Sequence, residues 1–157
     1  VYNNGDKPAI KQLMDAYQET NASVLGVQKV PADETYKYGI VAPVKEINPR
    51  LFEIGHIIEK PEVDQAPSQY AVLGRYVLSE KIFDALEQTP EGKNGQIQLT
   101  DAISILLKTE KVFAYEYEGI RYDVGDHFGF LKANIEYGLR RPDIKDQILD
   151  YLNKIQK

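Results

Sequence analysis

Residues 52–61 read F-E-I-G-H-I-I-E-K-P, and the isoleucines in the middle are β-branched and apolar, as in a buried strand. The strand ends on two opposite charges, Glu59 and Lys60, before Pro61 removes a backbone donor and stops the ladder. Neighbouring strand residues point to opposite faces, so these two charges cannot neutralise one another as a cross-strand pair would. The stretch therefore predicts a core strand that delivers two charges in different directions at its end.

Strands and helices alternate on both sides of this stretch, without an internal repeat, which predicts an α/β chain. Further strands are expected at residues 23–30, 38–41, 71–78, 111–117 and 120–122. Helices are expected at residues 6–20, 79–86, 102–107 and 128–139, and a last one begins at Pro142. The expected capping residues at the helix starts are Asp6, Ser79, Thr100 or Asp101, and Asp126.

Length and composition exclude several classes of protein. The chain has 157 residues, which suits one domain, and a formal net charge of -5, which argues against a nucleic-acid surface. It has no cysteine, so neither a disulfide nor a thiolate metal site is possible, and two histidines are too few for a multi-histidine metal site. No apolar run is long enough to cross a membrane. Because of the net charge and the missing apolar run, neither nucleic acid nor membrane is expected as a partner.

Two short stretches carry groups that suit a ligand, and each has a plainer interpretation. Glu59 could accept hydrogen bonds from two adjacent sugar hydroxyls while Lys60 neutralises a phosphate, or both could end an exposed strand in solvent. The residues alone leave this pair open. In the pair Tyr38 and Gly39, the glycine could let a ligand approach the backbone, but the spacing favours a turn glycine.

Two further stretches raise the same question. In R-Y-D-V-G-D, residues 121–126, Asp123 leaves a strand before a helix and could hold Mg²⁺ or merely cap that helix, whereas capping is the favoured interpretation of Asp126. In G-Q-I-Q-L-T-D, residues 95–101, polar side chains could reach a pocket, but capping is the favoured interpretation of Thr100 and Asp101.

The order of these stretches resembles one family closely. The motifs are K-Q-L-M-D-A-Y, S-V-L-G-V-Q-K-V-P, Y-G-I-V, I-E-K-P, A-P-S-Q-Y-A-V-L-G-R-Y-V-L, Q-I-Q-L-T-D-A-I and R-Y-D-V-G-D-H-F-G-F-L-K-A. Between Lys11 and Leu139 they resemble the bacterial UTP–glucose-1-phosphate uridylyltransferases. The resemblance implies the C-terminal half of a Rossmann-like, glycosyltransferase-A-like nucleotidyltransferase domain with a mixed sheet. The family's G-x-G-T-R nucleotide loop and its Asp-Asp pair do not occur in the sequence, so the N-terminal nucleotide-binding half is expected to be absent.

The resemblance assigns the sugar to one group of residues. It implies that Tyr38 and Gly39 lie along the sugar, with the Gly39 backbone against a hydroxyl. It implies that Glu59 binds glucose hydroxyls and that Val72 contacts the sugar through its backbone.

The resemblance assigns the phosphates to two residues that would be catalytic. It implies that Lys60 binds the phosphate of glucose 1-phosphate, and that Asp123 is a Mg²⁺ ligand jointly with an aspartate outside this chain. The sequence departs from the family at Gln96, where glutamate is usual, and at His127, where lysine is common.

The implied activity is the synthesis of UDP-glucose and pyrophosphate from UTP and glucose 1-phosphate, by in-line attack without a covalent enzyme intermediate. The 157-residue chain alone is expected to be inactive. Alternatives are a non-catalytic sugar-nucleotide-binding or regulatory module, and a related nucleotidyltransferase that uses another nucleotide or sugar. The family is typically cytoplasmic and dimeric or tetrameric, and half of such a sheet is expected to expose a long strand edge and an apolar face.

Overall fold

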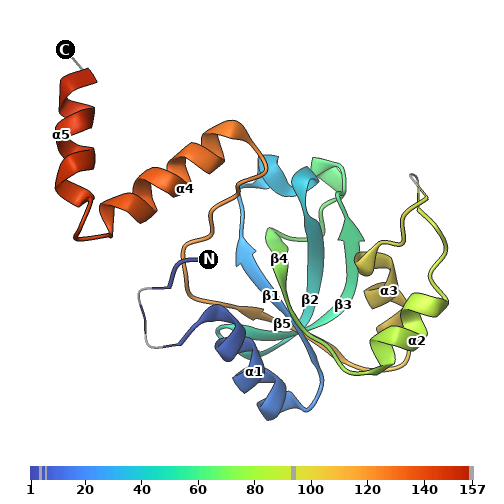
Figure 1. The fold of residues 1–157 in the computed structure, drawn as a ribbon. Helices are drawn as coiled ribbons and strands as arrows, with labels where there is room; N and C mark the ends of the chain where they lie inside the picture. The colour runs from blue at the N-terminus through green and yellow to red at the C-terminus, as the bar shows by residue number, and fades with distance from the viewer. Residues whose placement is uncertain (4, 6, 93–94, 156–157) are drawn as a thin grey trace. The chain divides into compact units, whose positions relative to one another are not determined.

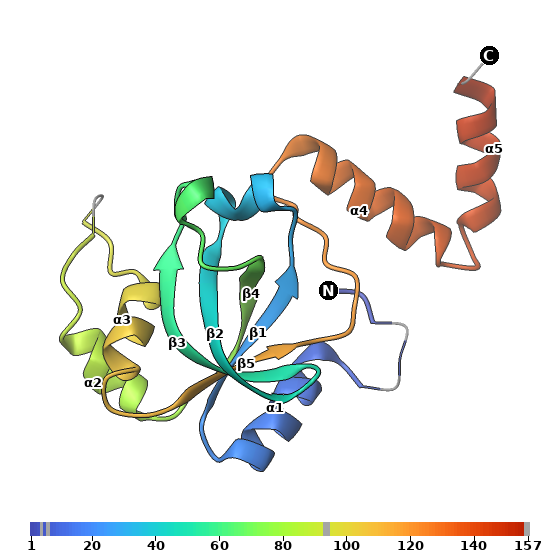
Figure 2. The same cartoon turned by 180° about the vertical axis from the view of Figure 1, so that it is seen from behind.

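The computed structural model describes the chain except for residues 4, 6, 93–94 and 156–157. The described residues form two compact units, one of residues 5–118 and one of residues 119–157 with the N-terminal residues. The first unit contains α1 (Ala9–Thr20), β1 (Ser23–Lys29), β2 (Gly39–Asn48), β3 (Leu51–Glu59), β4 (Tyr70–Val77), α2 (Lys81–Glu87), α3 (Leu99–Leu106) and β5 (Val112–Glu116), with short 3₁₀ turns at Ala32–Lys37 and Val63–Gln65. The second contains α4 (His127–Leu139) and α5 (Lys145–Ile155) (Figures 1 and 2).

The five strands form one mixed sheet that closes on itself in the order β1-β4-β2-β3-β5. β1 and β5 pair in parallel, and the other neighbours are antiparallel. Because the sheet closes, each described strand has a partner on both sides, and the long exposed edge expected for half a sheet does not occur. The fold class is confirmed as α/β with a mixed sheet, and the closure is a feature that the sequence patterns do not predict.

The core forms because the strands are apolar on both faces. Alternate residues of each strand belong to two different apolar clusters, as a side-chain period of two requires. Val41 and Val72 belong to the cluster that includes α2 and α3, whereas Ile40 and Ala71 belong to the cluster that includes α1. In Figure 1, α2 and α3 lie side by side on a different flank of the strands from α1. The sequence-predicted strands other than residues 120–122 are all present with ends shifted by at most two residues, except that the strand expected at 38–41 continues to Asn48.

Three details of the sequence prediction are wrong. Residues 120–122 are not a strand, although Ile120 forms an isolated bridge with Tyr2. The Ser79 side chain does not cap α2, because its hydroxyl donates to Glu110 at 2.8 Å. Thr100 and Asp101 do not cap α3, whose N-terminus has no side-chain cap. The expected cap Asp6 lies outside the described residues, and α1 begins after Pro8.

The second unit is held together by polar and aromatic contacts around Arg140. The guanidinium lies 4.3 Å from the centre of the Tyr2 ring and donates to Glu136 at 2.9 Å. Asp126 caps α4 as predicted, because its carboxylate accepts from the Gly129 amide at 2.8 Å. The apolar side of α4 is largely exposed, with Phe128 at 75%. No helix among the described residues is long and apolar enough to cross a membrane.

Candidate functional site

A pocket of about 240 Å³ lies in the first unit where three strands meet the start of α3. Strand register explains why its residues gather, because Gly39 of β2 pairs with Glu59 of β3 on one side and with Val72 of β4 on the other. The register therefore unites Tyr38, Gly39, Glu59 and Val72, the residues that the family resemblance assigned to the sugar. The lining residues are Lys37, Tyr38, Gly39, Glu59, Val72, Tyr76, Gln98, Leu99 and Thr100.

Gly39 is a strand residue against which other side chains pack closely, and the favoured interpretation as a turn glycine is wrong. It is the buried first residue of β2, and it is not among the residues with positive φ. A Cβ built on Gly39 would lie 3.1 Å from Oε2 of Glu59 and 3.4 Å from Oγ1 of Thr100. The missing side chain therefore makes room for the Glu59 carboxylate rather than for a backbone turn.

The Glu59 carboxylate is half-buried and hydrogen-bonded, so it does not simply end a strand in solvent. Its Oε2 accepts a hydrogen bond of 2.6 Å from the Thr100 hydroxyl. Tyr76 lies across the same pocket, and burial, followed by the nearby Glu59 charge, raises the pKa of the Tyr76 hydroxyl. A carboxylate held in this way can accept hydrogen bonds from neutral hydroxyl groups of a ligand.

Lys60 adopts a backbone conformation that is unusual for its residue type. Its φ is +46°, in the left-handed region, although it precedes Pro61 and has a side chain. The Lys60 amide still donates to the Tyr38 carbonyl at 3.0 Å, so the pairing of β2 and β3 continues to this point. The turn then redirects the exposed lysine away from the direction that a regular strand would give it.

The charge of Lys60 is available to a ligand. None of the ion pairs among the described residues involves Lys60. Strained conformations of this kind cost on the order of 1–3 kcal/mol and concentrate at functional sites. Together with the adjacent pocket, this conformation makes Lys60 a candidate anion-binding residue.

Asp123 belongs to the second unit, whereas the residues that line the pocket belong to the first. Arg121 donates to its Oδ2 at 2.6 Å, and the Gly125 amide donates to its Oδ1 at 3.0 Å. The described residues contain no group of three His, Asp or Glu side chains that could hold a metal ion. Asp123 could therefore supply one carboxylate ligand to Mg²⁺. The remaining ligands would have to be phosphate oxygens, water or groups from another chain segment.

Sequence reasoning missed part of the pocket. Tyr76 was not predicted as a pocket residue. It lies two residues beyond Gly74 and four residues beyond Val72, and this period of two is the signal that could have placed it on the pocket side of β4. In the stretch 95–101 the pocket interpretation holds for Gln98 and Thr100. Gln96 is exposed and is not one of the lining residues.

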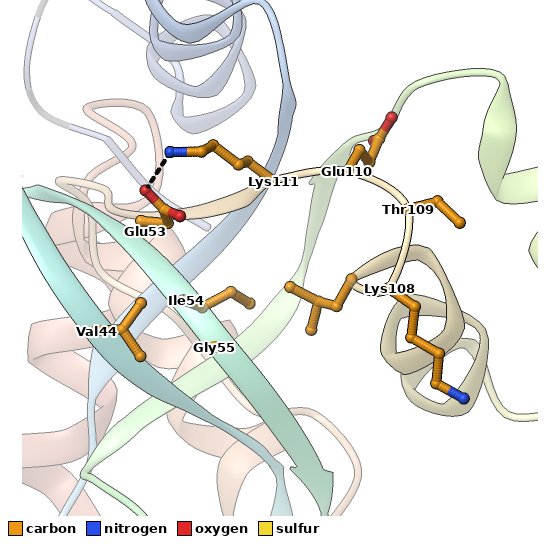
Figure 3. A pocket seen from close by; sticks show the side chains of 9 residues that line it. Val44, Glu53, Ile54, Gly55, Lys108, Thr109, Glu110 and Lys111 are labelled. Atoms are coloured by element: carbon orange, nitrogen blue, oxygen red, sulfur yellow. Dashed lines mark hydrogen bonds and ion pairs between the residues drawn. The ribbon is translucent and has the colours of Figure 1, made fainter.

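A larger cavity of about 420 Å³ lies between β3 and the α3–β5 loop, and both carboxylates that line it already have partners (Figure 3). Lys111 donates to Glu53 at 3.0 Å across its rim. Figure 3 shows the Glu110 side chain directed away from Ile54, and its Oε1 accepts from the Ser23 hydroxyl at 2.9 Å. The smaller pocket, with Glu59 and the nearby Lys60, is chemically better suited to a polar ligand.

Comparison with known proteins places this geometry in context. The nucleotidyl transferase family matches residues 2–138. The chain is 46% identical over 151 residues to the UTP–glucose-1-phosphate uridylyltransferase 2 of Staphylococcus saprophyticus, covering 96% of this chain and 52% of that protein. Its structure resembles a UDP-glucose pyrophosphorylase from Acinetobacter baumanii at a TM-score of 0.86 and 35% identity, covering 99% of this chain and 53% of that one.

A UDP-glucose pyrophosphorylase solved in complex with UDP-glucose is similar at a TM-score of 0.81 and 36% identity, covering 87% of this chain and 52% of that one. The chain therefore spans about half the length of each of these relatives.

Proposed function

Because the chain belongs to the nucleotidyl transferase family, we propose that its pocket is the sugar-phosphate subsite of a UTP–glucose-1-phosphate uridylyltransferase. The relatives that carry this name support the proposal. The observation that carries it is the register of β2, β3 and β4, which gathers Gly39, Glu59 and Val72 around one cavity. Lys60 follows immediately and carries no ion pair with the described residues.

In this proposal the pocket residues bind and orient glucose 1-phosphate. The Glu59 carboxylate accepts hydrogen bonds from sugar hydroxyls, while Tyr38 and the backbone of Gly39 and Val72 lie along the ring. The Lys60 ammonium binds the phosphate as a compact point charge with three donors. Positioning matters here because two anions must meet, and alignment together with charge stabilisation supplies most of the catalysis in phosphoryl transfer.

The proposed reaction is an in-line displacement at the α-phosphorus of UTP. The phosphate oxygen of glucose 1-phosphate forms the new bond, and pyrophosphate leaves with the electron pair of the broken bond. Lys60 offsets negative charge at the attacking phosphate. Enzymes that transfer nucleotidyl groups generally use a divalent cation to neutralise phosphate charge, and we assign Mg²⁺ to this role with Asp123 as one ligand.

The proposal extends to the setting of the whole protein. We propose that the UTP-binding groups are supplied by sequence that these 157 residues do not contain, because the relatives are about twice as long. We further propose that the protein is cytoplasmic and that it forms a homo-oligomer, a dimer or tetramer. The exposed aromatic side chains of α4, such as Phe128 and Phe130, support the self-association.

The test is a titration of the 157-residue chain with glucose 1-phosphate, followed by backbone amide NMR. We expect the largest shift changes at Gly39, Glu59, Lys60 and Val72, and weaker binding of glucose, which lacks the phosphate. Lys60→Ala should reduce the affinity for glucose 1-phosphate by roughly tenfold or more, as the loss of a hydrogen bond to a charged group does.

The matched control is Lys108→Ala, which removes another exposed lysine of the same unit that does not line the pocket. It should leave the affinity unchanged. Equal affinities of the Lys60 and Lys108 variants, or shift changes confined to residues away from the pocket, would contradict the proposal.

A further inference from the structure

We propose that Thr100 is a positioning residue for sugar recognition, because its hydroxyl fixes the carboxylate of Glu59 in the pocket. The inference rests on the proposed function, since it concerns how the same pocket distinguishes one sugar phosphate from another. Thr100 does not cap α3, so its hydroxyl is not needed for the helix start. Its partner is instead a carboxylate on β3, forty-one positions earlier in the sequence.

The hydrogen bond between Thr100 and Glu59 is short and charge-assisted. The Oγ1–Oε2 distance is 2.6 Å, within the range of the strong hydrogen bonds that hydroxyl groups donate to carboxylates. Among the residues that the structure describes, Thr100 is the one donor to this carboxylate. Removing the hydroxyl would therefore leave Glu59 without a fixed orientation.

Thr100 is itself held rigidly. It lies in the first turn of α3, whose residues Ala102, Ile103 and Leu106 are buried in the same apolar cluster as Ile57 and Val72. The β-branched threonine also has fewer side-chain rotamers than serine would have. The rigid helix α3 therefore holds the Glu59 carboxylate of β3 in one orientation through Thr100. Supporting residues usually orient a binding site in this way.

The chemical consequence concerns which hydroxyls the pocket accepts. With Oε2 occupied by Thr100, the second oxygen of Glu59 and the remaining lone pair of Oε2 face ligand hydroxyls in a fixed plane. The missing Cβ of Gly39 keeps this arrangement open, because a Cβ there would lie 3.1 Å from Oε2 of Glu59 and 3.4 Å from Oγ1 of Thr100. Sugars with the hydroxyl pair in another geometry would leave the buried polar groups unpaired, and such mismatches reduce binding strongly.

The experiment compares three variants by their dissociation constants for glucose 1-phosphate and its 2-deoxy and 3-deoxy analogues. Thr100→Val keeps the shape and removes the donor, and Thr100→Ser keeps the donor. Thr89→Val is the matched control, because Thr89 is a buried threonine two residues beyond the end of α2 whose hydroxyl donates to the Ala85 carbonyl at 2.7 Å, outside the pocket. Calorimetry or NMR titration of the 157-residue chain gives each constant.

We expect Thr100→Val to bind glucose 1-phosphate roughly tenfold more weakly and to lose most of its preference over the deoxy analogues. Thr100→Ser should restore both the affinity and the preference. The control should keep the preference even where it lowers stability, because a merely structural role cannot change a ratio of affinities.

The outcomes separate the two proposals. If the unmodified chain binds glucose 1-phosphate at the pocket but Thr100→Val keeps the same preference over the deoxy analogues, the role of Thr100 is refuted and the proposed function stands. If the unmodified chain does not bind glucose 1-phosphate, the proposed function is refuted, and the role of Thr100 with it.

Discussion

Gly39→Ala is the most direct perturbation of the pocket, because it adds one methyl group in tight contact with the Glu59 carboxylate. The new Cβ would lie 3.1 Å from Oε2 of Glu59 and 3.4 Å from Oγ1 of Thr100. Ordinary contact begins at about 3.4 Å, so the carboxylate must retreat by a few tenths of an ångström. A shift of this size disturbs the 2.6 Å hydrogen bond between Thr100 and Glu59.

The expected result separates folding from binding. Gly39 has no positive φ, so alanine fits the backbone, and the lower entropy of the unfolded chain offsets part of the steric cost. The free energy of unfolding, measured by urea denaturation, should change by less than about 1 kcal/mol. The affinity for glucose 1-phosphate should fall roughly tenfold, which corresponds to about 1.4 kcal/mol.

The control is Ile40→Val, at the next position of β2. Ile40 is fully buried and belongs to the cluster around α1, so its side chain lies on the other face from the pocket. Removing one methylene should cost about 0.5–1.5 kcal/mol of stability and leave the affinity unchanged. If Gly39→Ala binds glucose 1-phosphate as tightly as the unmodified chain, the pocket is not the sugar site or the Glu59 carboxylate does not contact the sugar.

Three further predictions follow from the same geometry. Lys60→Gly should raise the free energy of unfolding by roughly 1 kcal/mol, since glycine accepts a φ of +46° without strain, and should also weaken phosphate binding; a destabilised variant in urea would refute the strain. Burial and the Glu59 charge raise the pKa of Tyr76, so the stability it contributes is full below the normal tyrosine pKa and is lost as the pH rises through the folded value. The ultraviolet titration curves of the unmodified chain and of Tyr76→Phe should differ by one tyrosine that ionises at a higher pH than exposed tyrosines do. This difference in pH should be smaller when the chain carries Glu59→Gln. The 157-residue chain should make no UDP-glucose from UTP and glucose 1-phosphate, and pyrophosphate release by the pure chain in a coupled assay would contradict this.

The fold could be predicted from sequence where a local pattern decides it. The apolar runs of β1, β3 and β4 and the Asp126 cap of α4 are local signals, and the structure shows all of them. The closure of the sheet is not local, because it depends on the pairing of β3 with β5 and of β1 with β4, strands far apart in the sequence. No periodicity within one strand contains that information.

The sequence predicts several of the residues that line the pocket, but not the strand pairing and hydrogen bonds that bring them together. The family resemblance assigned Gly39, Glu59 and Val72 to one ligand, and only the register shows why these three positions meet. Thr100 was misassigned, because a threonine before an apolar helical run looks the same whether it caps the helix or reaches a distant carboxylate. Tyr76 was missed because a tyrosine in a strand usually only packs.

The two charges at the end of β3 are now distinguished by what holds them. Glu59 is fixed from outside its own strand, by a hydroxyl on α3 and by the space that Gly39 leaves on β2. Lys60 is fixed by its own backbone, which turns into the left-handed region at the residue before Pro61. Asparagine or glycine would adopt that conformation at lower cost, so packing and stability do not explain a lysine here. A cationic side chain retained in a strained turn beside a pocket is best explained by the anion that it binds, and this links the strain of Lys60 to the proposed phosphate.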